Sequence, residues 1–156
     1  MLDKMPITKE GLEKLREQLR NILNVERPKN IKAIQEARSH GDLNENAEYH
    51  AAKERQAFLE AKINELEIAI NRSEVIEISK EPTERIIFGA TVKLRNINNN
   101  QHVTYKLVGP YESDPDNGKI SIASPIGKAL IGKEEDDTVR IKTPGGVQEF
   151  EILEVT

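Results

Sequence analysis

The sequence predicts an α+β fold, in which an N-terminal antiparallel α-helical coiled-coil hairpin precedes a small antiparallel β-sheet domain with one short helix. Apolar residues between residue 8 and about 78 recur at spacings of three and four, with one Pro and two Gly in that stretch. From about residue 82, short β-rich runs are separated by Gly, Pro, Asn and Asp. Pro82 marks the expected linker at 80–83, so we expect a hairpin domain at 1–79 and a second domain at 80–156.

The first helix is expected to begin after Thr8, a residue type that favours the N-cap position. Its apolar face changes phase near Pro28, which removes an amide donor and predicts a kink there. The apolar positions on the two sides of the phase change are Leu12, Leu15, Leu19 and Ile22, and then Ile31, Ile34 and Ala37.

The second helix shows a heptad pattern with one polar position, Gln56. Its seam is Tyr49, Ala52, Gln56, Leu59, Ile63, Leu66, Ile70 and Ser73. Gly41 favours a chain reversal in the turn at residues 40–42, so the two helices are expected to pack antiparallel. About 30 residues at ~1.5 Å rise each would make an arm of roughly 45 Å.

The C-terminal half has the pattern of a small sheet. Pro144-Gly145-Gly146 is a hairpin signal, and Pro125 can occupy the first position of a short helix at 125–131. Strands are expected at 86–94, 102–108, 119–123, 138–142 and 147–155.

Composition excludes several classes of protein. The chain has no Cys, no Trp, three Phe and three Tyr, which argues against disulfides, thiolate metal sites and base-stacking RNA modules. A net charge of −4 argues against unaided, tight, non-specific DNA binding. No apolar signal-peptide core and no run near the roughly 20 residues of a membrane span is present, so we expect a cytoplasmic protein without a membrane partner.

Charge is distributed unevenly along the hairpin. Seven basic and three acidic residues lie between Lys14 and Arg38, whereas residues 40–48 contain three acids and no Lys or Arg. Two of these acids, Asp42 and Glu45, are three residues apart at the expected turn. On spacing alone, a capping box at the start of the second helix is the commoner explanation. The alternative is a partial Mg²⁺ site, because Mg²⁺ is usually held by one or two carboxylates together with water and phosphate oxygens.

The run AIQEARSHGDLNENAEYHAAKE at residues 33–54 resembles the Gre transcript-cleavage and transcription elongation factor family, GreA type. The likeness continues at residues 75–76, 87–92, 124–137 and 142–146 and covers nearly the whole chain. It implies that the second domain is FKBP-like and docks on bacterial RNA polymerase, with the loop at Ser124, Pro125 and Ile126 facing the polymerase. That loop equally suits a plain helix start.

The resemblance also implies roles for residues at the turn. Asp42 and Glu45 would share a catalytic Mg²⁺ of the polymerase and position water, so the chain would have no metal or cofactor of its own. Arg38 and Lys53 would form the basic spot that contacts the 3′ end of nascent RNA in a backtracked complex. The chain would then be a monomer and no enzyme by itself, stimulating RNA cleavage by its partner. Lys53 is often Arg in relatives, and Ser39 replaces a common acid.

Three other functions stay open on the sequence. A Gre-fold regulator could occupy the same channel of the polymerase without stimulating cleavage. A prolyl isomerase would need an aromatic-lined pocket, and the second half holds few aromatic residues. In a plain coiled-coil interaction protein, the acids would be caps and the basic residues would only solvate helix faces.

Overall fold

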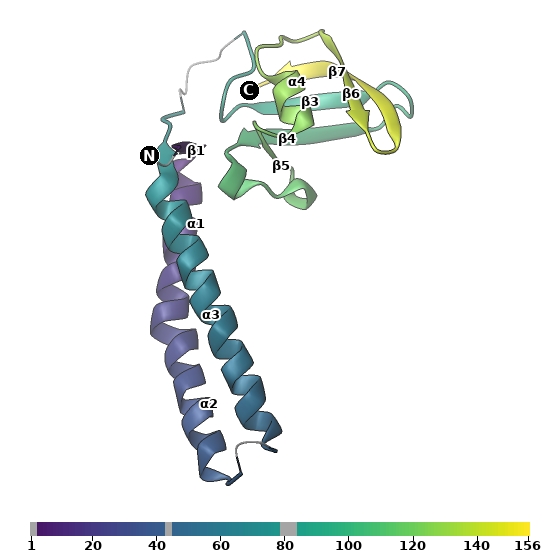
Figure 1. The fold of residues 1–156 in the computed structure, drawn as a ribbon. Coiled ribbons are helices and arrows are strands. Elements are labelled where there is room, and N and C mark those ends of the chain that lie inside the picture. Colours follow the sequence, from purple (N-terminus) through teal and green to yellow (C-terminus); the bar gives the residue numbers. More distant parts are fainter. Residues whose placement is uncertain (1–2, 43–44, 79–83) are drawn as a thin grey trace. The chain divides into compact units, whose positions relative to one another are not determined.

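The computed structural model describes residues 3–42, 45–78 and 84–156, and it has the expected α+β composition (Figure 1). The chain forms two compact units, which we call the hairpin unit (Leu12–Arg72) and the sheet unit (Met1–Gly11 with Ser73–Thr156). The expected linker at 80–83 lies outside the described residues, and the domain boundary after residue 79 stays a prediction.

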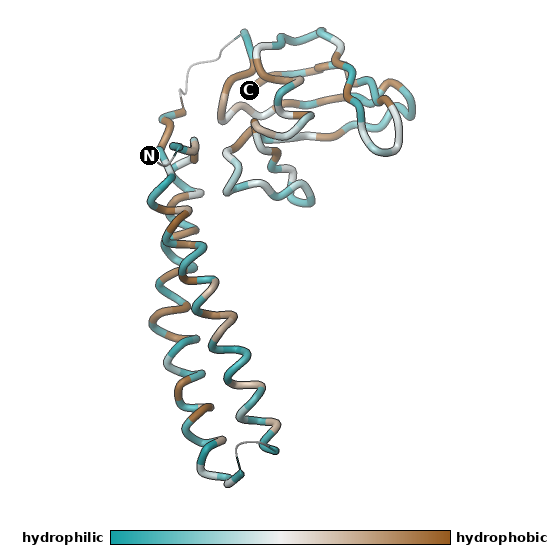
Figure 2. The backbone as a smooth tube through the Cα atoms, viewed as in Figure 1, coloured by the Kyte–Doolittle hydropathy of each residue, from teal (hydrophilic) through white to brown (hydrophobic). Residues whose placement is uncertain are grey.

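The hairpin unit contains the predicted antiparallel helices. The first arm comprises α1 (Lys9–Asn21), the π-helix η1 (Ile22–Glu26) and α2 (Arg27–Ser39), and it runs antiparallel to α3 (Ala47–Arg72) (Figure 1). Apolar positions recur along both arms (Figure 2). The buried residues of the seam are Leu12, Leu15, Ile22, Asn30, Ile34, Ala37, Ala52, Leu59, Ile63, Leu66 and Ala69. In the part of the chain that the structure describes, no helix is long and apolar enough to cross a membrane.

The phase change in the first arm comes from the π-helix, which ends at Glu26, two residues before Pro28. The amide of Arg27 donates to the carbonyl of Ile22, five residues earlier, so this turn holds one residue more than an α-helical turn. The faces after it rotate accordingly. Ile31, expected in the seam, is 45% exposed, whereas Asn30 is 8% exposed. That expectation for Ile31 was wrong, although Ile34 and Ala37 are buried as predicted.

The start of α1 is held by a predicted cap and by a contact that the sequence did not reveal. Thr8 is the N-cap, since its Oγ1 accepts the amide of Gly11 at 3.0 Å. The carboxylate of Glu112 accepts the Thr8 amide at 2.7 Å and also the Thr8 hydroxyl. Just before this cap, β1 (Met5–Ile7) pairs in parallel with β2 (Ser73–Val75), a two-stranded sheet that was not expected.

The sheet unit also contains a five-stranded sheet of order β5-β4-β3-β7-β6. Its strands are β3 (Thr91–Asn96), β4 (His102–Val108), β5 (Lys119–Ser121), β6 (Thr138–Thr143) and β7 (Gly146–Val155). Three of the pairs are antiparallel as predicted, but β4 and β5 are parallel, so the expectation of an antiparallel sheet needs correction. Two 3-10 turns, η2 (Pro110–Glu112) and η3 (Pro115–Asn117), make the crossover that parallel pairing requires.

The sheet packs against α4 (Pro125–Leu130), the predicted short helix. The first strand of the sheet begins at Thr91 rather than at residue 86, because Phe88 and Gly89 form a turn in which Gly89 has φ of 87°. Ile86 is nevertheless fully buried ahead of that turn. The core consists of Ile86, Ala90, Val92, Leu94, Leu107, Ile120, Leu130, Val139, Ile141, Phe150 and Ile152.

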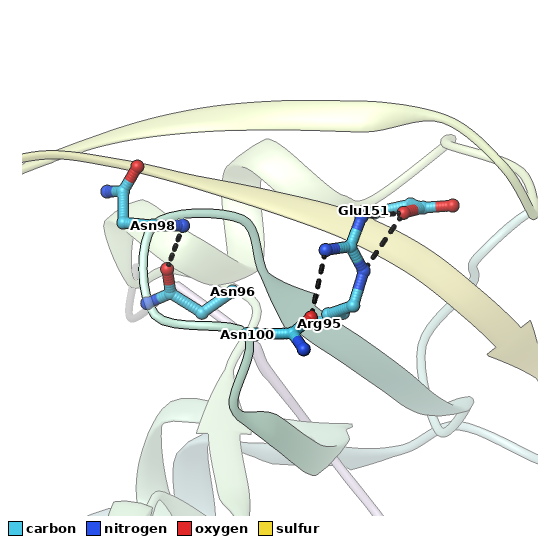
Figure 3. A network of polar contacts seen from close by, with 5 residues as sticks. All are labelled: Arg95, Asn96, Asn98, Asn100 and Glu151. Carbon is cyan, nitrogen blue, oxygen red and sulfur yellow. Dashed lines mark hydrogen bonds and ion pairs between the residues drawn. The ribbon is translucent and has the colours of Figure 1, made fainter.

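A polar network closes the turn between β3 and β4 (Figure 3). Arg95 donates to Glu151 of the neighbouring β7 at 2.5 and 3.2 Å and to Asn100 Oδ1 at 3.1 Å. Asn96 Oδ1 accepts the amide of Asn98 at 2.9 Å. Asn100 adopts a left-handed backbone with φ of 59°, a conformation that Asn tolerates better than most residues.

Candidate functional site

The two acids singled out by sequence lie in the connection between α2 and α3. Asp42 and Glu45 are both exposed. They line a shallow, open concavity together with His40, Asn46, Ala47 and Glu48. Gly41, at φ of 111°, turns the chain out of α2, as its residue type predicts. The connection therefore gathers three carboxylates at one end of the hairpin.

The cap of α3 is Asn46, not Asp42. The helix begins at Ala47, and the amide of Tyr49 donates to Asn46 Oδ1 at 3.0 Å. A capping box centred on Asp42 would require the helix to begin at residue 43. The capping explanation for Asp42 and Glu45 is therefore wrong for this helix. The sequence did contain the alternative, because Asn directly before a helix is among the preferred caps.

Asn46 also joins the two arms. Its Nδ2 donates to the carbonyl of Ala37, near the end of α2, at 2.5 Å. The same carbonyl accepts the amide of His40 at 3.2 Å. His40 Nδ1 lies 3.2 Å from a carboxylate oxygen of Glu48, a second and exposed link across the connection. No role for Asn46 was predicted from the sequence.

The two predicted basic residues lie close to this end of the hairpin. The Arg38 guanidinium, in the last turn of α2, is 5.9 Å from the centroid of the Tyr49 ring. Lys53 follows Tyr49 by four residues on α3, a spacing that places both on one helix face. Lys53 Nζ donates to Gln56 Oε1 at 2.9 Å. Arg38 thus contacts Tyr49, and Lys53 lies one turn further along α3 on the same face as Tyr49.

The predicted docking loop is a helix start. Ser124 is the N-cap of α4, and its Oγ accepts the amide of Gly127 at 3.1 Å and donates to the carbonyl of Ser121 at 2.6 Å. Pro125 is exposed, while Ile126 is half-buried against the core. The helix-start interpretation is confirmed. Docking of this loop on a polymerase stays a prediction, and the two roles are compatible.

The acids do not form a complete metal cage on their own. Within residues 3–42, 45–78 and 84–156, no group of three or more His, Asp or Glu side chains is arranged to hold a metal ion. Hard divalent cations require about six oxygen ligands. A site in which Asp42 and Glu45 share a metal ion with ligands from a partner stays a prediction.

Comparison with known proteins identifies the family. The family model described as "Transcription elongation factor, N-terminal" matches residues 5–75, and the one described as "Transcription elongation factor, GreA/GreB, C-term" matches residues 81–156. The chain belongs to the GreA/GreB family of transcription elongation factors.

Relatives in this family are similar over their full length. The transcription elongation factor GreA of Haemophilus influenzae is 54% identical over 99% of this chain and 98% of that protein. GreA of Thermodesulfovibrio yellowstonii is 50% identical over 100% of this chain and 99% of that protein. Among solved structures, the transcription factor Gfh1 matches with 32% identity over 99% of each chain and a TM-score of 0.47.

A pocket of a different kind lies in the sheet unit of this GreA/GreB family member. Its lining is Arg85, Ile86, Ile87, Phe88, Ile122, Lys128, Ile131 and Gly132. Phe88 is its one aromatic residue. Phe150 is buried in the core, and Tyr105 packs partly buried against it. The aromatic lining that a prolyl isomerase would need is thus not gathered in this pocket.

Proposed function

We propose that this GreA/GreB family member binds RNA polymerase and stimulates the polymerase's own cleavage of backtracked nascent RNA. The carboxylates of Asp42 and Glu45 would complete the ligand shell of a Mg²⁺ ion in the polymerase active site. The polymerase supplies the reaction, and the chain raises its rate.

One observation carries this proposal: both acids are exposed in the connection, and Asn46 serves as the cap of α3 instead. Side chains recruited to cap a helix direct their oxygens at its first amides. Because Asn46 meets that need, Asp42 and Glu45 are not required for the start of α3. Their position at one end of a hairpin arm also suits delivery into a narrow site, since the 26 residues of α3 span ~39 Å at ~1.5 Å each.

The chemistry follows from the ligand type. Two carboxylates make a weak isolated site but a useful partial one, because Mg²⁺ combines a few protein carboxylates with water and phosphate oxygens. A second bound metal ion in phosphodiester hydrolysis activates water or stabilises the leaving oxygen. Asp42 and Glu45 would hold that ion and orient the water, and a fixed arrangement of reacting groups is itself a large part of catalysis.

Arg38 and Lys53 would contact RNA phosphates beside this site. The exposed Arg38 guanidinium lies 5.9 Å from the centroid of the Tyr49 ring. Arg presents a planar fork to phosphate, whereas Lys53 presents a flexible point charge and would bind with less directionality. The exposed Pro125, at the start of α4, would belong to the surface that docks on the polymerase.

A cleavage assay on stalled, backtracked elongation complexes tests the proposal. Wild-type chain with Mg²⁺ should shorten the RNA from its 3′ end, and Asp42→Asn should abolish this while leaving polymerase binding intact. A wild-type chain that binds polymerase but only slows synthesis would contradict the proposal and favour a regulator without cleavage activity.

A further inference from the structure

Asn46 uses both halves of its side-chain amide at the end of the hairpin. Oδ1 accepts the Tyr49 amide in the first turn of α3 at 3.0 Å, and Nδ2 donates to the Ala37 carbonyl near the end of α2 at 2.5 Å. The backbone carbonyl of Asn46 also accepts the amide of His50 at 3.1 Å. The residue is half-buried between the arms. It therefore links the end of α2 to the start of α3. We call the hydrogen bond from Asn46 Nδ2 to the Ala37 carbonyl the tie.

Few other side chains could make this tie. It needs an acceptor and a donor on one short, planar group, which Asn provides. Ionised Asp offers acceptors but no donor. Ser is too short to span from the cap position to the opposite helix. The last carbonyls of a helix and its first amides are the groups that lack partners within the helix. Asn46 bonds one from each helix at the same time: the Tyr49 amide, and the Ala37 carbonyl, which also accepts the amide of His40.

The tie joins the two ends of the chain segment that contains the two acids. Asp42 and Glu45 lie between the residues it joins, Ala37 and Asn46, in a connection that contains Gly41 in a conformation open to few other residues. Without the tie, the separation and direction of the connection's ends would be less fixed. Both carboxylates would then sample more positions.

We propose that Asn46 is a positioning residue, whose carboxamide sets where the carboxylates of Asp42 and Glu45 stand. This inference rests on the proposed function. A misplacement of about 1 Å in a catalytic group can cost on the order of 100-fold in rate. Loss of the tie should therefore lower the cleavage rate within the bound complex while leaving the affinity for polymerase unchanged.

Two variants separate the tie from the cap. Asn46→Ser and Asn46→Asp both keep an oxygen that can cap α3, and both lose the donor to Ala37. They differ in charge, so a defect shared by both is due to the lost donor. The matched control is Asn30→Ser. It removes a similar bond between the arms, from Asn30 Nδ2 to the carbonyl of Ala52 at 3.0 Å, about two helical turns along α2 from Ala37.

The first measurement is backbone order in the free chain. Amide ¹⁵N relaxation should show lower order parameters for Gly41, Asp42 and Glu45 in both Asn46 variants, with circular dichroism reporting unchanged helix content. Asn30→Ser should leave the order of these three residues at the wild-type level. Unchanged order in the Asn46 variants would overturn the inference, whatever the cleavage assay shows.

The second measurement is cleavage of backtracked RNA as a function of factor concentration. Both Asn46 variants should lower the maximal rate by about 10- to 100-fold and leave the half-saturating concentration within about twofold of wild type. Asn30→Ser should keep the wild-type maximal rate. A wild-type maximal rate in both Asn46 variants would overturn the inference. If the wild type itself fails to cleave, the proposed function fails and the catalytic role of Asn46 falls with it, while the relaxation data still decide whether Asn46 orders the turn.

Discussion

Replacement of Asp42 by Ala should separate stability from function. Because Asp42 is exposed and lies outside the cap of α3, its loss should change the free energy of unfolding by no more than about 0.5 kcal/mol. Asn46→Ala is the matched comparison. It removes an N-cap, which contributes about 1 kcal/mol, and a bond between the helices, which contributes about 1 kcal/mol more.

Thermal unfolding followed by circular dichroism measures this difference. For a unit of this size, 1 kcal/mol corresponds to a change in Tm of about 4–8 °C. Asp42→Ala should therefore stay within a few degrees of wild type, while Asn46→Ala should unfold about 8–16 °C lower. In the cleavage assay, Asp42→Ala should lower the maximal rate by about 100-fold or more, since loss of even an outer-shell partner of a metal costs about 10- to 100-fold.

Two results would refute this reasoning in different ways. A loss of stability in Asp42→Ala equal to that of Asn46→Ala would mean that Asp42 supports the helix start after all. Wild-type cleavage by a fully stable Asp42→Ala would mean that its carboxylate takes no part in the chemistry. Polymerase binding, measured by competition with the wild-type chain, should be unchanged in either variant.

Three further predictions follow from other parts of the structure. Leu59→Ala removes a 1%-exposed side chain from the hairpin seam and should lower the free energy of unfolding by about 2–5 kcal/mol in denaturant titrations. Lys53→Ala should weaken phosphate contact, so that cleavage falls while Lys53→Arg retains or improves it; equal activity in all three chains would exclude a role for this residue in RNA contact. Glu112→Ala strands the buried amide of Thr8 and should cost about 2–3 kcal/mol, with a smaller loss for Glu112→Gln.

The helices were predictable because periodicity at three and four residues reports burial directly. Ala52, Leu59, Ile63 and Leu66 form the seam as expected. The wrong prediction for the seam, that of Ile31, lies where the three-and-four spacing of apolar residues is interrupted. A π-helical turn adds one residue, which moves Asn30 into the seam in place of Ile31, and nothing in the sequence states where that extra residue goes.

Strand positions were largely predictable, but strand partners were not. The sequence pattern of β4 and β5 predicts that each is a strand and about how long it is. Their parallel pairing depends instead on the path of the ten residues between them. The pairing of β1 with β2 likewise joins segments at opposite ends of the hairpin sequence. Such contacts are set by tertiary packing, which local patterns do not encode.

The candidate site shows why Asp42 and Asn46 were hard to tell apart by sequence. Both belong to the residue types that cap helices, and both precede the second helix. Local propensity allowed the helix to begin after either one. The structure places the start at Ala47. There the side-chain carboxamide of Asn46 bonds both the Ala37 carbonyl and the Tyr49 backbone amide. A tertiary hydrogen bond to the other arm therefore accompanies the choice of cap.

The use of a neutral amide as the cap has a consequence for the acids. A carboxylate that caps a helix accepts hydrogen bonds from backbone amides and is stabilised by the helix dipole, which lowers its tendency to bind a cation. With Asn46 in that position, neither Asp42 nor Glu45 is needed to cap α3, and in the proposed function their negative charge would act on a metal ion. Removal of this cap by Asn46→Ala should therefore impair metal-dependent cleavage through the position of the acids, beyond its cost in stability.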